Sequence, residues 1–583
     1  MKIAMIANIQ LIRKGWRTAY AKNEAVSIWV RGQAHLGNEH FGTKALAERF
    51  ATVALEGSVE GLDELVSSLN GTWAVVVKCG EWVYLATDHL RSIQILYRVD
   101  GDALYVFDDM EDFRKTHKLV FDEDCVQEYL SSGYVYGNRT LYKETYSLQA
   151  AERVWVGERS CVDGGGKNSR VEHVERVEGG KWKVSSTALR KIEKRLGQVV
   201  VESWRYWRYV PNINKPVATD GALVERIDNT FLAAMRRLVE SVGNKRIIVP
   251  LSGGYDSRLI VNYLYLLGVK NVLCYTYGVK GNGESRCSKE VASRLGYEWH
   301  FVEYTNENRT VLLNDVKADA CFRYMCNGTN RYCNQEHIAI QALKDSDVLN
   351  SEMDVIVPGY YFDFLAGSKV NPRANNLFAA SEMCQWENNF YPKGHFRKSI
   401  KAIQSVFDEH DDLSPKVFYE GWAWQERLAK FIVNNVRDYE WLGFEWRLPL
   451  CDRDLYDLWL SLPYSLRRGR HYFYRIFPKI AVEEIRAIGF NNHGKQSFVR
   501  KAKQSIGEMI PYSLRFRLDR LLNRKIRYGG GTLASTQLDV RQLADSIVEM
   551  FPFCKERLSD LSNVSPNAAM SLRGLVSEAG VKL

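Results

Sequence analysis

Residues 1 to about 160 contain short apolar runs separated by glycine and aspartate turns. These runs are Ile28 to Val30, Thr72 to Lys78, Trp82 to Thr87, Ile95 to Arg98 and Leu104 to Phe107. Runs of this length that are rich in β-branched and aromatic residues and bounded by turn residues are typical of β-strands. This part of the chain is therefore predicted to form an antiparallel or layered β domain.

Helical periodicity follows after about residue 220. Apolar side chains recur every three or four positions between Ala222 and Val242, which predicts an amphipathic helix. Three strands with helical segments between them come next: Arg246 to Leu251, Asn271 to Tyr277 and His300 to Tyr304. This βαβαβ order favours a parallel sheet whose ligand site lies beyond the carboxyl ends of its strands. After Tyr304 mainly helices are predicted, including Val417 to Asp438 and Asp454 to Leu462.

The first of these strands leads into a loop of small residues, Ser252-Gly253-Gly254-Tyr255-Asp256-Ser257, and then into a helix, Arg258 to Leu267. Two glycines let the backbone approach an anion closely, and the start of the helix offers unpaired N–H donors. The Walker pattern is excluded because no Gly-Lys-Ser/Thr closes the loop. Asp256 is better suited to hold Mg²⁺ than to contact phosphate directly. The alternative is an ordinary turn between a strand and a helix.

The bulk composition is that of a multidomain enzyme without a membrane span. A chain of 583 residues exceeds a single core, and no apolar run approaches the roughly 20 residues that cross a bilayer. The start, MKIAMIANIQ, lacks the features of a signal peptide, so we expect a cytoplasmic protein. A net charge of +9 suits anionic small substrates, an anionic surface or nucleic acid, and does not choose between them.

The eleven cysteines form no CxxC pair. The closest group, Cys321, Cys326 and Cys333, lacks the ligand spacing of a zinc site. We therefore expect reduced and mostly buried thiols.

A basic segment lies near the end of the chain. Tyr512 to Tyr528 contains six arginines and lysines interleaved with leucine, phenylalanine and isoleucine. Such a segment can lie on an anionic membrane surface. The alternative, which we favour, is a helix that packs on the protein and exposes its basic face to solvent.

Four separated stretches resemble asparagine synthetases, and their order and spacing carry the resemblance. The loop itself resembles the pyrophosphate-binding signature of the ATP pyrophosphatase superfamily. The stretches are Asn70 to Tyr97, Tyr129 to Leu141, the loop preceded by Tyr206-Trp207, and Glu445 to Asp452 with Leu462-Pro463 and His493 to Phe498. Thiouridine-forming relatives that act on tRNA share the loop but not the other stretches, so we expect no nucleic-acid partner.

The resemblance implies an α/β protein with three regions. Residues 1–205 would be a layered, β-rich domain like a glutaminase (Ntn-hydrolase-like), residues 206–510 a synthetase domain with a parallel sheet, and residues 511–583 a helical basic extension. It also implies ATP and Mg²⁺ as cofactors, Asp256 and Asp363 as metal ligands, and Lys495 as the catalytic charge beside a tetrahedral oxyanion. The implied ATP contacts are Leu251, Ser252, Gly253, Gly254, Asp256, Ser257, Tyr277 and Gly359.

Two positions depart from the family. The glutaminase nucleophile is a cysteine directly after the initiator methionine, and here that residue is Lys2, whose ammonium group cannot form a thioester. We therefore predict that glutamine is not hydrolysed. The second departure is Tyr360, which replaces an acidic residue and resembles a tyrosine of β-lactam synthetases that pairs with a glutamate.

For this partner of Tyr360 the sequence offers Glu387, or else Glu382. A phenol needs such a neighbour to act as a base, because its unperturbed pKa is about 10. The equally open alternative is a tyrosine that packs against the nucleotide.

The function predicted from these residues is an ATP-dependent, AMP-forming amide ligase acting on a small-molecule or glycan carboxylate. The nitrogen would come from free ammonia, from a separate glutaminase or from an amine, and a membrane-surface substrate stays open. The alternatives are a true glutamine-hydrolysing asparagine synthase and a non-catalytic scaffold that keeps the nucleotide fold.

Overall fold

The computed structural model describes residues 5–21, 26–56, 58–132, 134–158, 173–176, 182–185, 192–196, 199–212, 221–305, 307–308, 316–330, 335–386, 403 and 414–490. Lys2, Glu387, Lys495 and the basic segment Tyr512 to Tyr528 lie outside this range, as does the side chain of Glu382. None of the helices in the described part is long and apolar enough to cross a membrane.

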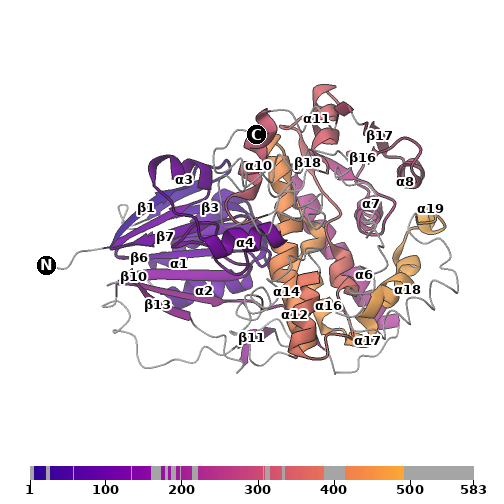
Figure 1. Ribbon diagram of the computed structural model, residues 1–583. Coiled ribbons are helices and arrows are strands. Elements are labelled where there is room, and N and C mark those ends of the chain that lie inside the picture. Colours follow the sequence, from indigo (N-terminus) through magenta and orange to yellow (C-terminus); the bar gives the residue numbers. More distant parts are fainter. Residues whose placement is uncertain are drawn as a thin grey trace, which may run out of the picture.

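The amino-terminal part contains two stacked sheets, which occupy the indigo side of Figure 1. The smaller sheet has the order β1 (Ile6–Gln10), β8 (Ala103–Phe107), β7 (Leu96–Asp100) and β9 (Thr145–Ser147). The larger sheet has the order β13 (Ile192–Leu196), β14 (Val199–Arg205), β10 (Glu152–Glu158), β6 (Trp82–Thr87), β5 (Asn70–Cys79), β3 (Val26–Leu36) and β2 (Arg17–Ala21), with β4 (Glu39–Phe41) beside β3. All pairs in this larger sheet are antiparallel.

Strict alternation of side chains explains the layering. On β5, Ala74 and Val76 belong to the core between the two sheets, whereas Val75 and Val77 belong to the core on the opposite face. Helices α1 (Thr43–Leu55) and α2 (Val59–Ser68) contribute Leu46, Phe50, Leu62 and Val66 to that second core. Because successive strand residues point to opposite faces, one apolar strand serves both cores. The expected layered β-rich region is therefore present, while its likeness to a glutaminase stays a prediction.

The second part is built on a five-stranded sheet. Its order is β17 (Glu298–Glu303), β16 (Val272–Gly278), β15 (Arg246–Pro250), β18 (Asp354–Ile356) and β19 (Glu445–Trp446), and every pair is parallel. The three strands predicted from apolar runs are confirmed to within two residues. β19 was not predicted, because two residues are too few to show a period.

Helices connect and surround this sheet. They are α6 (Gly221–Val242), α7 (Asp256–Leu266), α8 (Gly283–Leu295), α10 (Val316–Cys326), α11 (His337–Asp345), α12 (Leu377–Trp386), α14 (Pro415–Trp422), α15 (Val436–Trp441), α16 (Arg453–Ser461), α17 (Tyr464–Arg467), α18 (His471–Ile480) and α19 (Glu483–Arg486). The predicted helix Val417 to Asp438 is helical throughout, but its centre, Ala423–Ile432, is a π-helix. Such wide turns are frequent at functional sites.

Polar contacts join the two parts. Arg31 of β3 forms an ion pair with Glu440 of α15, with 2.6 Å between Nη2 and Oε1. Lys430 of the π-helix donates to the carbonyls of Val135 and Gly137, at 2.8 and 2.6 Å. Helices of the second part are thus held by the β-rich part.

Candidate functional site

The loop between β15 and α7 is held in shape by its own hydroxyl groups. The backbone N–H of Ser252 donates to Oγ of Ser257 at 3.0 Å, and that of Gly254 donates to Oγ of Ser252 at 3.2 Å. The turn leaves the carboxyl end of β15 and enters α7 at Asp256. The small residues of the loop and the amino-terminal end of α7 therefore lie together at the carboxyl-terminal edge of the sheet, where ligands of parallel α/β folds bind.

This loop forms one wall of a cavity of about 380 Å³. The lining residues are Ser252, Gly253, Gly254, Tyr255, Asp256, Gly359, Asp363, Arg470, Phe473, Tyr474 and Phe490. Of the residues predicted from the sequence, six lie here: Ser252, Gly253, Gly254, Asp256, Gly359 and Asp363. Segments about a hundred residues apart thus meet at one cavity, which is large enough for a nucleotide-sized ligand.

Two carboxylates line this cavity: Asp256 begins α7, and Asp363 follows β18 in the chain. The backbone N–H of Asp363 donates to Oδ2 of Asp256 at 3.1 Å. Burial, with the nearby Asp363 carboxylate as a second cause, raises the pKa of Asp256 to about 8. A nearby cation would relieve this repulsion, and oxygen ligands from two carboxylates suit Mg²⁺. The residues present therefore fit the metal site that was predicted at Asp256 and Asp363.

A glycine is required where the two segments touch. A Cβ atom on Gly359 would lie 2.5 Å from the backbone nitrogen of Ser257 and 2.8 Å from its Cα. Real Cβ atoms do not approach backbone atoms so closely, so any side chain here would push the loop away from the segment that carries Asp363. Gly359 thus sets the distance between the loop and the second carboxylate.

The cation and the stacked aromatic side chains of the cavity were not predicted from the sequence. Nη1 of Arg470 lies 3.4 Å from Oδ2 of Asp363, and Arg470 adopts a left-handed backbone with φ of 63°. The ring of Tyr255 stacks on Phe490 with 3.7 Å between centroids, and on Tyr474 with 4.8 Å. Arg470 follows Gly469, which is itself left-handed, and two consecutive left-handed residues re-aim a chain in a way that no periodic pattern reveals.

Tyr360 lies in a separate cluster of phenols around one carboxylate. Its hydroxyl is 2.7 Å from the hydroxyl of Tyr439 and donates to Oε1 of Glu336 at 3.3 Å. Oε2 of Glu336 accepts from Tyr275 at 2.7 Å and from Tyr439 at 2.9 Å. Burial raises the pKa of Glu336 above its ordinary value. Among the described residues, the carboxylate beside Tyr360 is therefore Glu336, which was not predicted. The predicted partner Glu387, or else Glu382, has no described side chain, so that pairing stays a prediction.

A small cavity of about 30 Å³ adjoins this cluster. It is lined by Gln335, Glu336, Tyr360, Asn435, Asp438 and Tyr439. Between Tyr360 and Asp363 the backbone of Tyr361 has φ of 116°, a value that residues with a side chain rarely adopt. This conformation places Tyr360 on the small cavity and Asp363 on the large one, only three residues apart.

Three predicted ATP contacts, Leu251, Ser257 and Tyr277, do not line the large cavity. Leu251 is buried and joins the sheet, with its N–H donating to the carbonyl of Tyr275 at 2.8 Å. Tyr277 stacks on Tyr304 with 5.0 Å between centroids. Leu251 therefore anchors the start of the loop to the sheet, and Ser257 holds the loop through its hydroxyl group.

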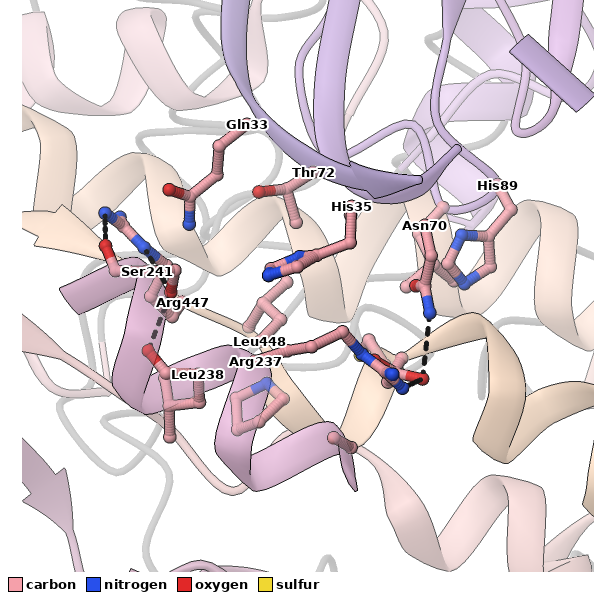
Figure 2. Close-up of a pocket in the computed structure, with 16 residues that line it drawn as sticks. Gln33, His35, Asn70, Thr72, His89, Arg237, Leu238, Ser241, Arg447 and Leu448 are labelled. Carbon is pink, nitrogen blue, oxygen red and sulfur yellow. Dashed lines mark hydrogen bonds and ion pairs between the residues drawn. The ribbon is translucent and has the colours of Figure 1, made fainter. Parts of the chain in front are cut away.

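A further cavity lies between the β-rich part and α6, as Figure 2 shows. Asn70, the first residue of the stretch Asn70 to Tyr97, lines this cavity. Its side-chain amide donates to Oδ1 of Asp452 at 3.0 Å. Asp452 also accepts from Arg237 of α6, at 2.7 and 2.8 Å. His89 lies beside them, and burial lowers the pKa of its imidazole to about 3, so the ring is neutral. These charges are already paired, and they tie the two parts together.

No protein-family model matches this chain, and no curated protein matches it. Solved structures give partial likenesses. The NH₃-dependent NAD synthetase from Campylobacter jejuni is 14% identical over 25% of this chain and 59% of its own, with a TM-score of 0.19. The glutamine-dependent NAD⁺ synthetase from Acinetobacter baumannii is 13% identical over 30% of this chain and 31% of its own, with a TM-score of 0.17.

The U34-tRNA thiolase from Methanococcus maripaludis is 13% identical over 59% of this chain and 90% of its own, with a TM-score of 0.20. The chain thus spans less than two thirds of either NAD synthetase. Scores this low carry no conclusion about activity, which rests on the geometry of the site.

Proposed function

We propose that this protein is an ATP-dependent, AMP-forming amide ligase related to asparagine synthetases. It would activate a carboxylate as an acyl adenylate and transfer ammonia or an amine to it. The observation that carries the proposal is the shared cavity: the loop residues Ser252 to Asp256 and the second carboxylate, Asp363, line one space that can hold a nucleotide.

In this proposal the loop holds the pyrophosphate end of ATP. The glycines bring backbone N–H groups close to the phosphate oxygens, and the start of α7 adds the positive end of a helix. Asp256 and Asp363 would hold Mg²⁺, which supplies positive charge to the phosphates when bound. Arg470 adds a second positive charge on the same wall, where it now pairs with Asp363.

The first step is attack of a substrate carboxylate oxygen on the α-phosphorus of ATP. A P–O bond forms, the bond to the β-phosphate oxygen breaks, and pyrophosphate leaves. The chain's part in this step is orientation and charge, since phosphoryl and adenylyl transfer need little covalent chemistry from the protein.

The second step is attack of an amine on the acyl carbon, with AMP as the leaving group. The amine must lose a proton, and the cluster around Tyr360 supplies a route for it. The phenol of Tyr360 takes the proton while its own moves to Oε1 of Glu336, 3.3 Å away. A carboxylate with a raised pKa is a stronger base, which suits Glu336 to this role. By the family resemblance, Lys495 would stabilise the oxyanion.

The proposed nitrogen source is free ammonia, ammonia from a separate glutaminase, or an amine, because a lysine such as Lys2 cannot form the thioester that glutamine hydrolysis requires. The carboxylate would be a small molecule or a glycan, with a membrane-surface substrate as a further option, and we propose action in the cytoplasm. Release of glutamate from glutamine by the pure protein would contradict this assignment.

The test is a pyrophosphate-exchange screen over a panel of carboxylates, including sugar uronates and amino acids. We expect exchange of labelled pyrophosphate into ATP with one class of carboxylate, and its loss in the Asp363→Asn variant. Asp347→Asn is the matched control, because Asp347 is exposed and its left-handed backbone suits asparagine equally well. Full exchange in Asp363→Asn would contradict the proposal.

A further inference from the structure

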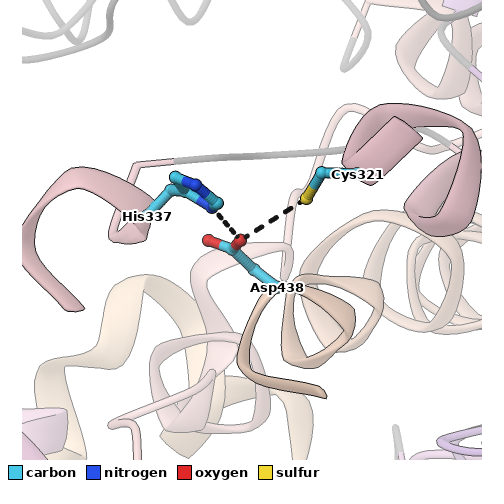
Figure 3. Close-up of side chains that lie close together, drawn as sticks. All are labelled: Cys321, His337 and Asp438. Carbon is cyan, nitrogen blue, oxygen red and sulfur yellow. Dashed lines mark hydrogen bonds and ion pairs between the residues drawn. The ribbon is translucent and has the colours of Figure 1, made fainter. Parts of the chain in front are cut away.

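Three side chains of types that bind metals in other proteins meet in one buried group, as Figure 3 shows. They are Cys321 on α10, His337 at the start of α11 and Asp438 on α15. Nδ1 of His337 lies 2.6 Å from Oδ1 of Asp438, and Sγ of Cys321 lies 3.9 Å from the same oxygen. In the described part of the chain, this is the one group of three such side chains within 4.8 Å of one another.

The three side chains are buried, and one of their polar atoms lacks a hydrogen-bond partner in the described part of the chain. The exposed fractions of Cys321, His337 and Asp438 are 1%, 9% and 2%. Among the described residues, Oδ2 of Asp438 has no hydrogen-bond partner, although Asp438 lines the small cavity. Oδ1 of Asn435, on the same cavity, also lacks a partner within the described part of the chain. A buried carboxylate oxygen without a donor is costly, so the site calls for a donor or a cation.

The ligand types select a borderline metal. Thiolate, imidazole and carboxylate together are the ligands of Zn²⁺, whereas Mg²⁺ and Ca²⁺ prefer oxygen alone. With bonds of about 2.3 Å to sulfur and about 2.0 Å to nitrogen and oxygen, tetrahedral ligand atoms lie roughly 3.3–3.6 Å apart. The observed separations of 2.6 and 3.9 Å bracket this range, so movements of under about 1 Å would complete the site.

A nucleophilic triad of the same three residue types is excluded by their order in space. In such a triad the imidazole lies between the thiol and the carboxylate. Here the carboxylate of Asp438 lies between Cys321 and His337. In addition, burial and the neighbouring Asp438 raise the pKa of Cys321 well above its ordinary value, which keeps the thiol protonated.

We propose that Cys321, His337 and Asp438 bind one Zn²⁺ ion that ties α10, α11 and α15 together. Binding displaces the thiol proton of Cys321 to solvent and replaces the hydrogen bond between His337 and Asp438 with two bonds to the metal. The fourth position faces the small cavity and takes water. The ion has no part in the ATP chemistry.

The position of the site gives the ion a structural consequence. His337 directly follows Glu336, the carboxylate that accepts from Tyr360, and Asp438 directly precedes Tyr439. An ion held by both neighbours fixes the ends of α11 and α15, and with them the phenol cluster. The spacing of the cysteines in the sequence did not indicate this site, because two of its three ligands are not cysteines and come from other helices.

The test is metal content and cobalt substitution of the full-length protein. We expect about one equivalent of zinc after dialysis against Zn²⁺ and then metal-free buffer, and a sulfur-to-cobalt charge-transfer band when Co²⁺ replaces it. Cys321→Ser should lose the band and most of the zinc. Cys274→Ser is the matched control, since Cys274 is a buried thiol in strand β16 outside this group, and it should keep both.

The cobalt spectrum of the unaltered protein decides the matter even if Cys321→Ser fails to fold. Absence of the sulfur-to-cobalt band in the unaltered protein would overturn the proposal. Equal zinc in folded Cys321→Ser, or equal loss in Cys274→Ser, would overturn it as well. Because none of these measurements uses ATP or pyrophosphate, their failure is distinct from a failure of the proposed ligase activity.

Discussion

Replacing Asp256 with asparagine should stabilise the metal-free protein and abolish its chemistry. The carboxylate has a pKa of about 8 in the folded chain, against an ordinary value of 3.8, because of burial and then the nearby Asp363. The folded state therefore binds this proton more tightly than the unfolded state does. Between pH 3.8 and 8 the native state loses stability as the pH rises, since unfolding releases the proton.

The size of the effect follows from the shift. At 1.36 kcal/mol per pKa unit, the raised pKa of Asp256 lowers the free energy of unfolding by at most about 4 kcal/mol at pH 7 and about 2 kcal/mol at pH 5. Relaxation around the site reduces it, so we expect Asp256→Asn to gain on the order of 1–3 kcal/mol at pH 7. An amide oxygen still accepts from the N–H of Asp363, so the loop contact is kept.

The assay is thermal unfolding in EDTA at several pH values between 5 and 8. Asp256→Asn should melt above the unaltered protein, with a gap that widens as the pH rises, while pyrophosphate exchange disappears. Asp354→Asn is the control, because Asp354 is buried and accepts twice from Arg246 at 2.9 Å. Removing that charge should lower the melting temperature. An Asp256→Asn variant that melts lower at pH 8, or that retains exchange, would refute the reasoning.

Three further changes test other parts of the structure. Gly359→Ala should lower pyrophosphate exchange about 100-fold or more, because its Cβ would displace the backbone of Ser257; a purified variant with unchanged exchange would contradict this. Tyr360→Phe should keep exchange but slow amide formation by roughly 10²- to 10⁴-fold, as single-turnover assays of the two steps can show. Arg467→Met should lower the free energy of unfolding in urea by about 3–5 kcal/mol, because it leaves the buried Glu420 without its partner 2.5 Å away. The exposed pair of Lys44 and Glu48 is its control, with a change below about 1 kcal/mol.

The elements that the sequence predicted well are those whose signal is local. Strands β15 and β16 are nearly continuous apolar runs because a parallel sheet buries both faces of its inner strands. The positions of these strands and of the half-buried edge strand β17 were predicted to within two residues. The loop Ser252 to Ser257 was recognisable because backbone access to an anion needs small residues in one short stretch. Cys125, Cys274 and Cys451 are buried free thiols, as expected.

The residues that were missed owe their position to tertiary contacts. Glu336 reaches Tyr360 from the residue that precedes α11, and nothing near it in the sequence distinguishes it from Glu382 or Glu387. Arg470 reaches Asp363 across 107 residues through a left-handed turn. The π-helix at Ala423–Ile432 could not be predicted either, because its apolar spacing also fits an α-helix. Its buried ion pair, Lys430 with Glu426 at 2.6 Å, forms only against the carbonyls of the β-rich part.

Contacts between the β-rich part and α15 indicate what the β-rich part does if it hydrolyses no glutamine. Glu440 lies one residue after Tyr439, and although burial raises its pKa, the guanidinium groups of Arg31, Arg437 and Arg13 bring it down to about 2. Arg31 and Arg13 belong to the β-rich part. The negative charge of Glu440 on α15 is therefore neutralised mostly by residues of the β-rich part. Without them Glu440 would be a buried carboxylate with one remaining guanidinium partner, at a cost of several kcal/mol. The phenol cluster around Glu336 therefore depends on the β-rich part for its geometry, which gives that part a structural role in the proposed ligase independent of any nucleophile at position 2.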